Sequence, residues 1–307
     1  IFGSLLFSYF YKDAFELSDL LSHPDMRIRQ KAQFELAKRG DPAPLQDALL
    51  YSDSLNARLH AIWGIGQIIR SSSALEHSTE AMESILVTAL GDGESEIRAQ
   101  AAKTLGDPPS PLAQDACIEL LADESLRVRY HAAMTLGKLK SIEAIPFIVG
   151  MIMENTSDDR FIRHAAATAL WKIGDSDALE ELAAHPLPAV RMCAVLAMRR
   201  LHHPSLEIAM FDDDDAVSLA AVRAVHDLPV PEAMPALASL SKDYEGSFDS
   251  GSSIARGAIK NDDVRITPFL RRVISAHQKI GNERGVSAIA GIASNSSLPE
   301  KIRMHIY

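Results

Sequence analysis

The sequence predicts an all-α protein, a right-handed α-solenoid of about eight helix–turn–helix repeats. Three observations support this prediction. An arginine recurs near the start of successive helices, alanine and leucine follow it at a helical spacing, and a turn that usually carries aspartate precedes it. Because one pair of short helices cannot bury its own apolar face, neighbouring pairs must stack side by side.

The clearest repeat runs from Asp123 to Gly137. Asp123 or Ser125 can accept hydrogen bonds from the first free backbone N–H groups of its helix. The apolar positions recur every fourth residue and share one face; they are Val128, Ala132 and Leu136. Gly137 is expected to loosen the end of this helix.

Six arginines align the repeats in order and are separated by 28 to 40 residues: Arg29, Arg58, Arg98, Arg129, Arg163 and Arg191. The turn aspartates that precede them are Asp25, Asp53, Asp92, Asp123 and Asp159. A seventh repeat has Ser218 where the arginine is expected. Another apolar helix lies ahead of each turn, so each repeat consists of a first helix, a tight turn and a second helix.

The arginines and aspartates are interpreted as a structural ladder that stabilises the stacking of repeats. Each arginine lies in the first turn of a second helix, behind a turn carboxylate. Partly buried pairs of this kind specify packing more than they add net stability. A site for an anionic partner is the alternative, and the alternation of opposite charges along the ladder favours the structural interpretation.

The array is expected to cover residues 14–241, with residues 1–13 as a packing segment or the tail of a preceding domain. Residues 242–253 are rich in glycine, serine and acidic residues and are interpreted as a loop insertion. Residues 254–307 are expected to continue the array and to be truncated in the last repeat, as in a segment of a longer protein. The apolar start is too short for a membrane span, which needs about 20 residues.

Composition argues against several functions. The net charge of −10 makes nucleic acid a poor partner, and the two cysteines, Cys117 and Cys193, lie in no CxxC or CxxCH context. The chain has no GxGxxG, GxxxxGK[ST], GxSxG or HExxH motif. No enzyme activity, catalytic residue, cofactor or metal is therefore expected.

A polar strip on the second helices is the expected binding surface, facing a concave groove. Its members occupy the position two residues after the aligned arginine; they are Lys31, His60, Gln100 and His131. Three or four ligands must converge on a metal ion, and the two histidines of this strip lie two repeats apart. The strip is thus predicted to contact a protein rather than a metal.

The repeats resemble bacterial HEAT repeats over most of the chain. The stretch from Ser22 to Gly40, and that from Leu270 to Gly281 with Leu298 to Arg303, are similar to the HEAT region of large membrane-bound-dehydrogenase-like bacterial proteins. In that family a sorbosone-dehydrogenase-like propeller precedes the repeats and a c-type haem domain follows them. The resemblance implies a spacer between redox domains and an extracytoplasmic location. HEAT-like deoxyhypusine hydroxylases carry iron on repeated His-Glu pairs, and this chain has no His-Glu dipeptide.

The predicted function is therefore a non-catalytic scaffold or interaction segment whose partner is protein, either its own flanking domains or a separate chain. One alternative is a stand-alone adaptor that binds a peptide in its groove. A second is a HEAT-based enzyme, such as a chromophore lyase acting on a bound protein.

Overall fold

Short helices arranged as consecutive pairs make up the computed structural model, which describes residues 12–72, 79–155, 159–241, 266–295 and 300. These residues form two compact units, 1–173 and 174–307. The segments predicted as an N-terminal packing segment, a loop insertion and a truncated last repeat fall almost wholly outside the described residues. No described helix is long and apolar enough to cross a membrane.

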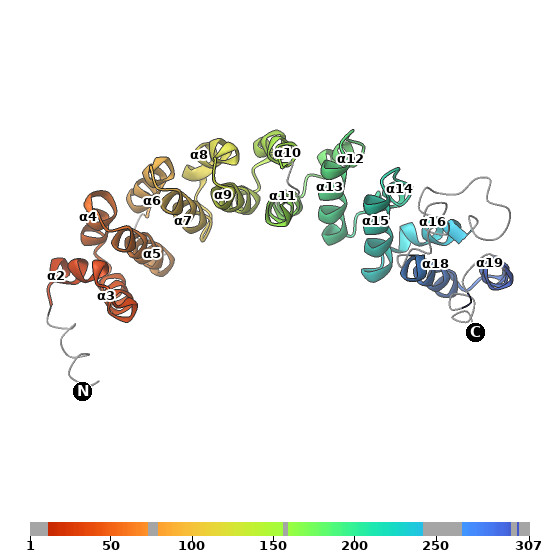
Figure 1. Cartoon of the computed structure of the whole chain (residues 1–307), viewed down its shortest axis with the longest axis horizontal. Helices are drawn as coiled ribbons and strands as arrows, with labels where there is room; N and C mark the ends of the chain where they lie inside the picture. The colour runs from red at the N-terminus through yellow and green to blue at the C-terminus, as the bar shows by residue number, and fades with distance from the viewer. Residues whose placement is uncertain (1–11, 73–78, 156–158, 242–265, 296–299, 301–307) are drawn as a thin grey trace, which may run out of the picture. The chain divides into compact units, whose positions relative to one another are not determined.

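The first unit alternates first and second helices (Figure 1). The first helices and their short 3-10 turns are α2 (Ala14–Asp19), η1 (Leu20–Ser22), α4 (Ala43–Tyr51), α6 (Glu80–Thr88), η2 (Ala89–Gly91), η3 (Pro111–Ala113), α8 (Gln114–Glu119), η4 (Leu120–Ala122), η5 (Ile142–Ala144) and α10 (Ile145–Met153). The second helices are α3 (Met26–Arg39), α5 (Leu55–Ser72), α7 (Ser95–Leu105), α9 (Leu126–Leu139) and α11 (Arg160–Ile173).

The second unit continues the same alternation. It contains α12 (Ser176–Ala183), α13 (Pro188–Leu201), α14 (Leu206–Ala209), α15 (Asp215–Asp227), η6 (Pro231–Ala233), α16 (Met234–Ser239), α18 (Ile266–Ile280) and α19 (Glu283–Ser294). Among the described residues the only β-type pairing is an isolated bridge between Gly106 and Pro109. The prediction of an all-α repeat solenoid is thus confirmed.

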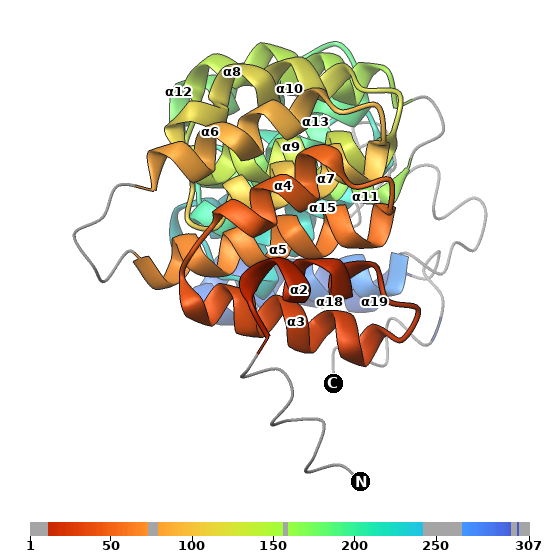
Figure 2. The ribbon, with the colours of Figure 1, turned by 90° about the vertical axis from the view of Figure 1, so that its left-hand side faces the viewer.

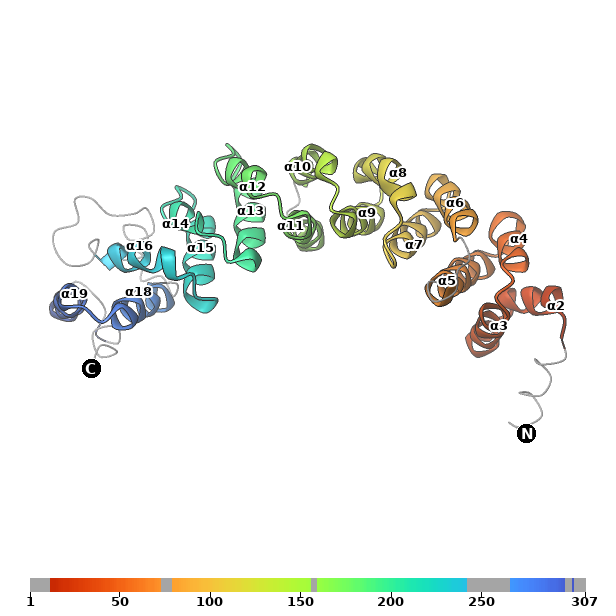
Figure 3. The ribbon, with the colours of Figure 1, turned by 180° about the vertical axis from the view of Figure 1, so that it is seen from behind.

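Within the first unit the helices form two rows (Figures 2 and 3). Helices α4, α6, α8 and α10 lie in one row, and α3, α5, α7, α9 and α11 lie in the other. Each second helix packs on the next, so that α3 contacts α5, α5 contacts α7, α7 contacts α9 and α9 contacts α11. We call these the first-helix row and the second-helix row.

The core lies between the two rows and consists mainly of alanine and aliphatic side chains. Val128, Ala132 and Leu136 are fully buried, as their spacing predicts. The buried Ala99, Ala101, Ala102, Ala165, Ala166 and Ala169 occupy α7 and α11, which both pack against α9. Small side chains allow the backbones of neighbouring second helices to approach closely, which brings the second-helix row together.

Gly137 was expected to loosen the end of its helix, and it lies inside the regular helix instead. Helix α9 continues to Leu139, and Lys140 takes the left-handed cap conformation with φ 56°. A Cβ atom on Gly137 would lie 2.6 Å from Cα of Ala169 in α11. The glycine therefore serves the close contact between two second helices rather than the helix terminus.

The arginine ladder joins successive repeats where its side chains are described. Arg98 donates to both carboxylate oxygens of Asp123 at 2.7 and 3.0 Å, and to the backbone oxygens of Asp92 and Gly93 in its own turn. Other links pair Arg58 with Asp92, Arg129 with Glu154 at 2.9 Å and Arg191 with Asp212 at 2.7 Å. Each of these arginines thus reaches a carboxylate of the next repeat.

The turn carboxylates also cap helices or stabilise the turns. Asp25 accepts a hydrogen bond from the Arg27 N–H, and Asp159 accepts from the Phe161 and Ile162 N–H groups. At Asp53 the turn differs, because the Ser54 N–H donates to the Ser52 hydroxyl instead. Arg163 occupies the aligned position in the first turn of α11.

Candidate functional site

Charge is segregated between the two rows of the first unit. The first helices and their 3-10 turns, within the described residues, carry acidic side chains and no lysine, arginine or histidine. The acidic residues are Glu16, Asp19, Asp47, Glu80, Glu83, Asp115, Glu119 and Glu143. The second helices carry nearly all of the cations, with Glu35 and Glu96 as their acidic residues. A chain that is acidic on average therefore presents a cationic second-helix row, which suits an anionic ligand.

A cavity of about 490 Å³ lies on the second-helix row between α7, α9 and the start of α11. Its walls combine two cations, two aromatic rings and a histidine; the lining residues are Lys103, Leu126, Arg127, Tyr130, His131, Asp159 and Phe161. Phe161 is 64% exposed. The volume lies in the range of small-molecule sites.

A second cavity of about 450 Å³ lies on the same row between α5, α7 and α9. It is lined by Trp63, Gln67, Arg70, Gln100, Lys103, Thr104, Asp107 and Lys138. Lys103 lines both cavities, so they adjoin at its side chain. We call the two together the second-helix channel.

Hydrogen bonds fix the polar walls of the channel. Trp63 Nε1 donates to Gln100 Oε1 at 2.9 Å, and Gln100 Nε2 donates to Glu96 Oε1 at 2.8 Å. Glu96 in turn pairs with Arg127 at 2.8 Å. Lys103, by contrast, forms no hydrogen bond or ion pair through its ammonium group with any described residue. Its charge is therefore available to a ligand.

The four residues predicted for the binding strip have different environments. His131 lines the first cavity and Gln100 the second. His60 is 5% exposed, with Nδ1 2.7 Å from Gln33 Oε1 and Nε2 accepting from Arg29 Nε at 3.2 Å. His60 thus joins neighbouring helices α3 and α5. Lys31 lies on α3 and lines neither cavity.

Several channel residues were not singled out from the sequence: Lys103, Arg127, Tyr130 and Phe161. They lie at other positions relative to the aligned arginine, and none belongs to a recognised motif. The repeated occurrence of cations on second helices and acids on first helices is a sequence signal that would have indicated this surface.

The imidazole of His131 is held neutral in the channel. Partial burial, together with the positive charges of Arg127 and Lys103, lowers the pKa of His131 to about 4. Lys138 acts in the same direction, while Glu96 opposes it. A neutral imidazole offers one acceptor nitrogen and one donor nitrogen to a ligand.

We expect the chain to lose stability as the pH falls from about 6.5 towards 4, in part through His131. The unfolded side chain binds its proton near the ordinary pKa of about 6.5, whereas the folded one does so near 4. Between these values the unfolded state binds more protons, so stability decreases with acidification. A variant with His131→Asn should show a smaller drop in melting temperature between pH 7 and pH 5. If the variant shows the same drop in melting temperature as the parent chain, His131 does not contribute to the loss of stability in acid.

Parts of this chain are similar to known proteins. The family described as HEAT repeats matches residues 83–162. Deoxyhypusine hydroxylase of Gallus gallus is 32% identical over 107 residues, which cover 34% of this chain and 36% of the relative. The bilin biosynthesis protein PecE of Mastigocladus laminosus is 28% identical over 154 residues, which cover 46% of this chain and 56% of the relative. The matches therefore span about a third to a half of each relative.

Among solved structures, the complex of CpcE and CpcF of phycocyanin lyase from Nostoc sp. PCC7120 aligns with a TM-score of 0.42 and 20% identity. The alignment covers 83% of this chain and 94% of that chain.

These relatives correct the functional prediction. The chain was expected to be a non-catalytic spacer and no enzyme, yet its curated relatives include deoxyhypusine hydroxylases and a bilin biosynthesis protein. The general resemblance to HEAT repeats is confirmed. The narrower resemblance to dehydrogenase-like proteins finds no support in these matches. The prediction was wrong because it used the absence of catalytic motifs as evidence against catalysis, while a site spread over several repeats has no local motif.

Proposed function

We propose that this chain is a HEAT-repeat enzyme of the chromophore-lyase type, which binds a bilin along its second-helix channel and acts on a partner protein. The similarity to PecE supports the ligand class. The observation that carries the proposal is the channel itself, two adjoining cavities that share the unpaired cation Lys103.

The cationic side chains of the channel suit the carboxylates of a bilin. A bilin is an open-chain tetrapyrrole that carries two carboxylates on a conjugated, largely apolar body. Arg127 lines one cavity and Lys138 the other, with Lys103 between them. Lysine and arginine are the side chains that bind carboxylates by charge-assisted hydrogen bonds. Two carboxylates can thus be neutralised at separate points along the channel.

The channel also offers apolar surface and an acceptor for the pyrrole groups. Tyr130 and Phe161 line the first cavity and Trp63 the second, so aromatic rings are available on both sides of Lys103. Aromatic rings stack on flat conjugated ligands. The neutral imidazole of His131 can accept a hydrogen bond from a pyrrole N–H.

The hydroxylase relatives suggest an iron enzyme as the other candidate, and the residues present do not fit iron. Within the described parts of the chain, no three His, Cys, Asp or Glu side chains lie close enough to hold a metal ion. His60 is engaged by Arg29 and Gln33, and the positive charges of Arg127 and Lys103 around His131 oppose a bound cation. The proposed function therefore does not involve a metal at these residues.

Titration of the purified chain with biliverdin tests the proposal. Saturable binding should shift the bilin absorption band and induce circular dichroism in it. Because Lys103 serves both cavities, Lys103→Met should weaken binding about tenfold, equivalent to the loss of about one charge-assisted contact. Lys12→Met removes the same charge outside the channel and should leave the affinity unchanged.

Two outcomes would contradict the proposal. One is the absence of saturable biliverdin binding by the folded chain. The other is equal weakening by Lys103→Met and Lys12→Met, which would indicate a non-specific electrostatic attraction. Covalent transfer of the bilin to an apo-phycobiliprotein, followed by fluorescence of the protein band, then tests the lyase step.

A further inference from the structure

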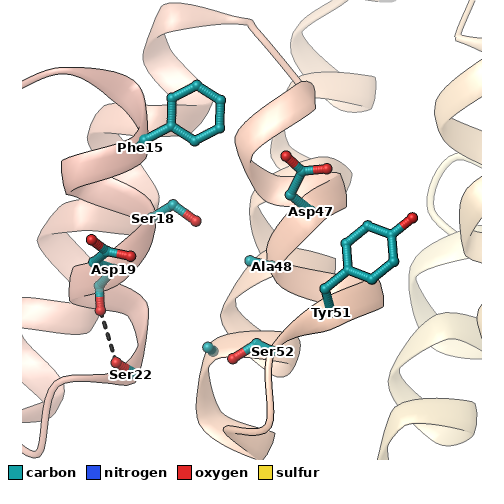
Figure 4. A pocket seen from close by; sticks show the side chains of 9 residues that line it. Phe15, Ser18, Asp19, Ser22, Asp47, Ala48, Tyr51 and Ser52 are labelled. Carbon is teal, nitrogen blue, oxygen red and sulfur yellow. Dashed lines mark hydrogen bonds between the residues drawn. The ribbon is translucent and has the colours of Figure 1, made fainter.

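A groove of about 310 Å³ lies between α2 and α4, the first helices of the first two repeats, and apart from the second-helix channel (Figure 4). It is lined by Phe15, Ser18, Asp19, Ser22, Asp47, Ala48, Tyr51, Ser52 and Ala57. Helix α2 and η1 supply one wall, and α4 with the residue that follows it supplies the other. The groove combines carboxylates, hydroxyl groups and aromatic rings.

The backbone of this groove is held in place by its own hydrogen bonds. The hydroxyl of Ser18 donates to the backbone oxygen of Pro44 at 3.1 Å, which joins α2 to α4. The hydroxyl of Ser22 donates to the backbone oxygen of Asp19 at 2.8 Å. Ala48 and Ala57 are buried beneath the surface. The two walls therefore keep a fixed separation, and the groove is formed before any ligand arrives.

The side chains at the surface of the groove lack partners of opposite charge. Neither the Asp19 nor the Asp47 carboxylate forms a hydrogen bond or ion pair with a described residue. Phe15 is 63% exposed and Tyr51 is 78% exposed. Carboxylates and exposed aromatic rings together are the groups that recognise a guanidinium or ammonium group, through charge-assisted hydrogen bonds and cation–π contacts.

The rest of the first-helix row strengthens this electrostatic preference. The described first helices of this unit carry acidic residues and no basic ones, so no cation on the row cancels the field at the groove. Further carboxylates follow on the next first helices, at Glu80 and Glu83 and then at Asp115 and Glu119. A partner with several spaced basic residues is attracted by all of these carboxylates and binds more tightly. A single small cation is attracted only by the carboxylates of the groove.

We propose that the α2–α4 groove is a docking site for a basic segment of a partner protein, with one lysine or arginine side chain inserted beside Phe15, Asp19 and Asp47. The acidic first-helix row attracts the segment, and the groove fixes its register. This surface differs from the second-helix channel, so the inference does not depend on bilin binding.

Fluorescence anisotropy with the full chain tests the proposal. The probe is a short fluorescein-labelled peptide that alternates arginine and leucine, and its counterpart has glutamate in place of arginine. The arginine peptide should bind, and the glutamate peptide should not. In the double variant Asp19→Asn, Asp47→Asn the affinity for the arginine peptide should fall about tenfold. Phe15→Ala leaves the charge unchanged and should weaken binding about threefold.

The matched control is the double variant Asp115→Asn, Glu119→Gln, which removes the same charge from α8 on the same row. Its affinity should fall less than about twofold, because only long-range attraction is lost. Equal weakening by the control and the groove variant would overturn the proposal in favour of general electrostatic attraction. Self-association of the chain that Phe15→Ala abolishes would overturn it in favour of a second copy. Circular dichroism confirms that each variant folds.

Discussion

Replacing Gly137 by valine is expected to destabilise the chain by about 3 kcal/mol, as overpacking at a close helix contact does. A Cβ atom at this position would lie 2.6 Å from Cα of Ala169 and 3.3 Å from its backbone oxygen. Backbone atoms cannot rotate away as the end of a long side chain can. Helices α9 and α11 must therefore separate, and the buried alanines between them lose contact.

Urea denaturation followed by far-ultraviolet circular dichroism measures this change. Gly150→Ala is the matched control, because Gly150 lies in α10 and a Cβ atom there meets nothing within 4 Å. Alanine is the better helix former, so this variant should gain about 0.5–1 kcal/mol. Equal stability of Gly137→Val and the parent chain would show that α9 and α11 do not approach each other this closely.

Replacing Arg98 by methionine is expected to destabilise the chain by about 3 kcal/mol, because the change leaves a poorly solvated carboxylate without its partner. The side chains of Arg98 and Asp123 are only 11% and 7% exposed. Burial raises the pKa of Asp123, but the hydrogen bonds from Arg98 and the Ser125 N–H outweigh it and hold the pKa below its ordinary value. Of the interactions that lower the pKa of Asp123, the hydrogen bond from Arg98 is the largest, and the substitution removes it.

Acid unfolding distinguishes this ladder pair from an ordinary surface pair. The pKa of Asp123 is lowered in the folded state. Ionised Asp123 therefore stabilises the fold at pH values above its unfolded pKa of about 4, and this stabilisation is lost as the pH falls. The parent chain should therefore lose more stability on acidification than Arg98→Met. Arg27→Met is the control, because Arg27 and Asp25 are 74% and 34% exposed and solvent screens their attraction. This variant should be nearly as stable as the parent chain. If Arg98→Met lowers the free energy of unfolding by less than about 1 kcal/mol, the arginine ladder does not stabilise the stacking of repeats.

The repeating fold was predictable because its signals are local. Val128, Ala132 and Leu136 are four residues apart, and the helical period alone puts them on one buried face. Asp25 and Asp159 cap the helices that follow them, and capping depends on residues close in sequence. Stacking then follows from the need of each helix pair to bury its apolar face.

The pairing between repeats was less predictable, since it depends on distances across the stack. The carboxylate that meets Arg129 is Glu154, at the end of α10, rather than the aspartate of the next turn. Arg29 bonds to His60, a residue whose position in the repeat predicts a place on the binding strip. A residue's position in the repeat gives its helix face, but the tilt between neighbouring helices decides which side chains come within reach.

The sequence by itself determined the helix-turn-helix repeat, the apolar faces and the positions of the aligned arginines, because helical periodicity and capping act over a few residues. Tertiary structure alone decided that Gly137 serves a helix contact and that Lys103 connects two cavities. The physical reason is that cavities and surface potential arise from side chains on different repeats. The net charge of −10 is a sum over the whole chain, and it conceals the cationic surface that the second helices of the first unit form together once they are stacked.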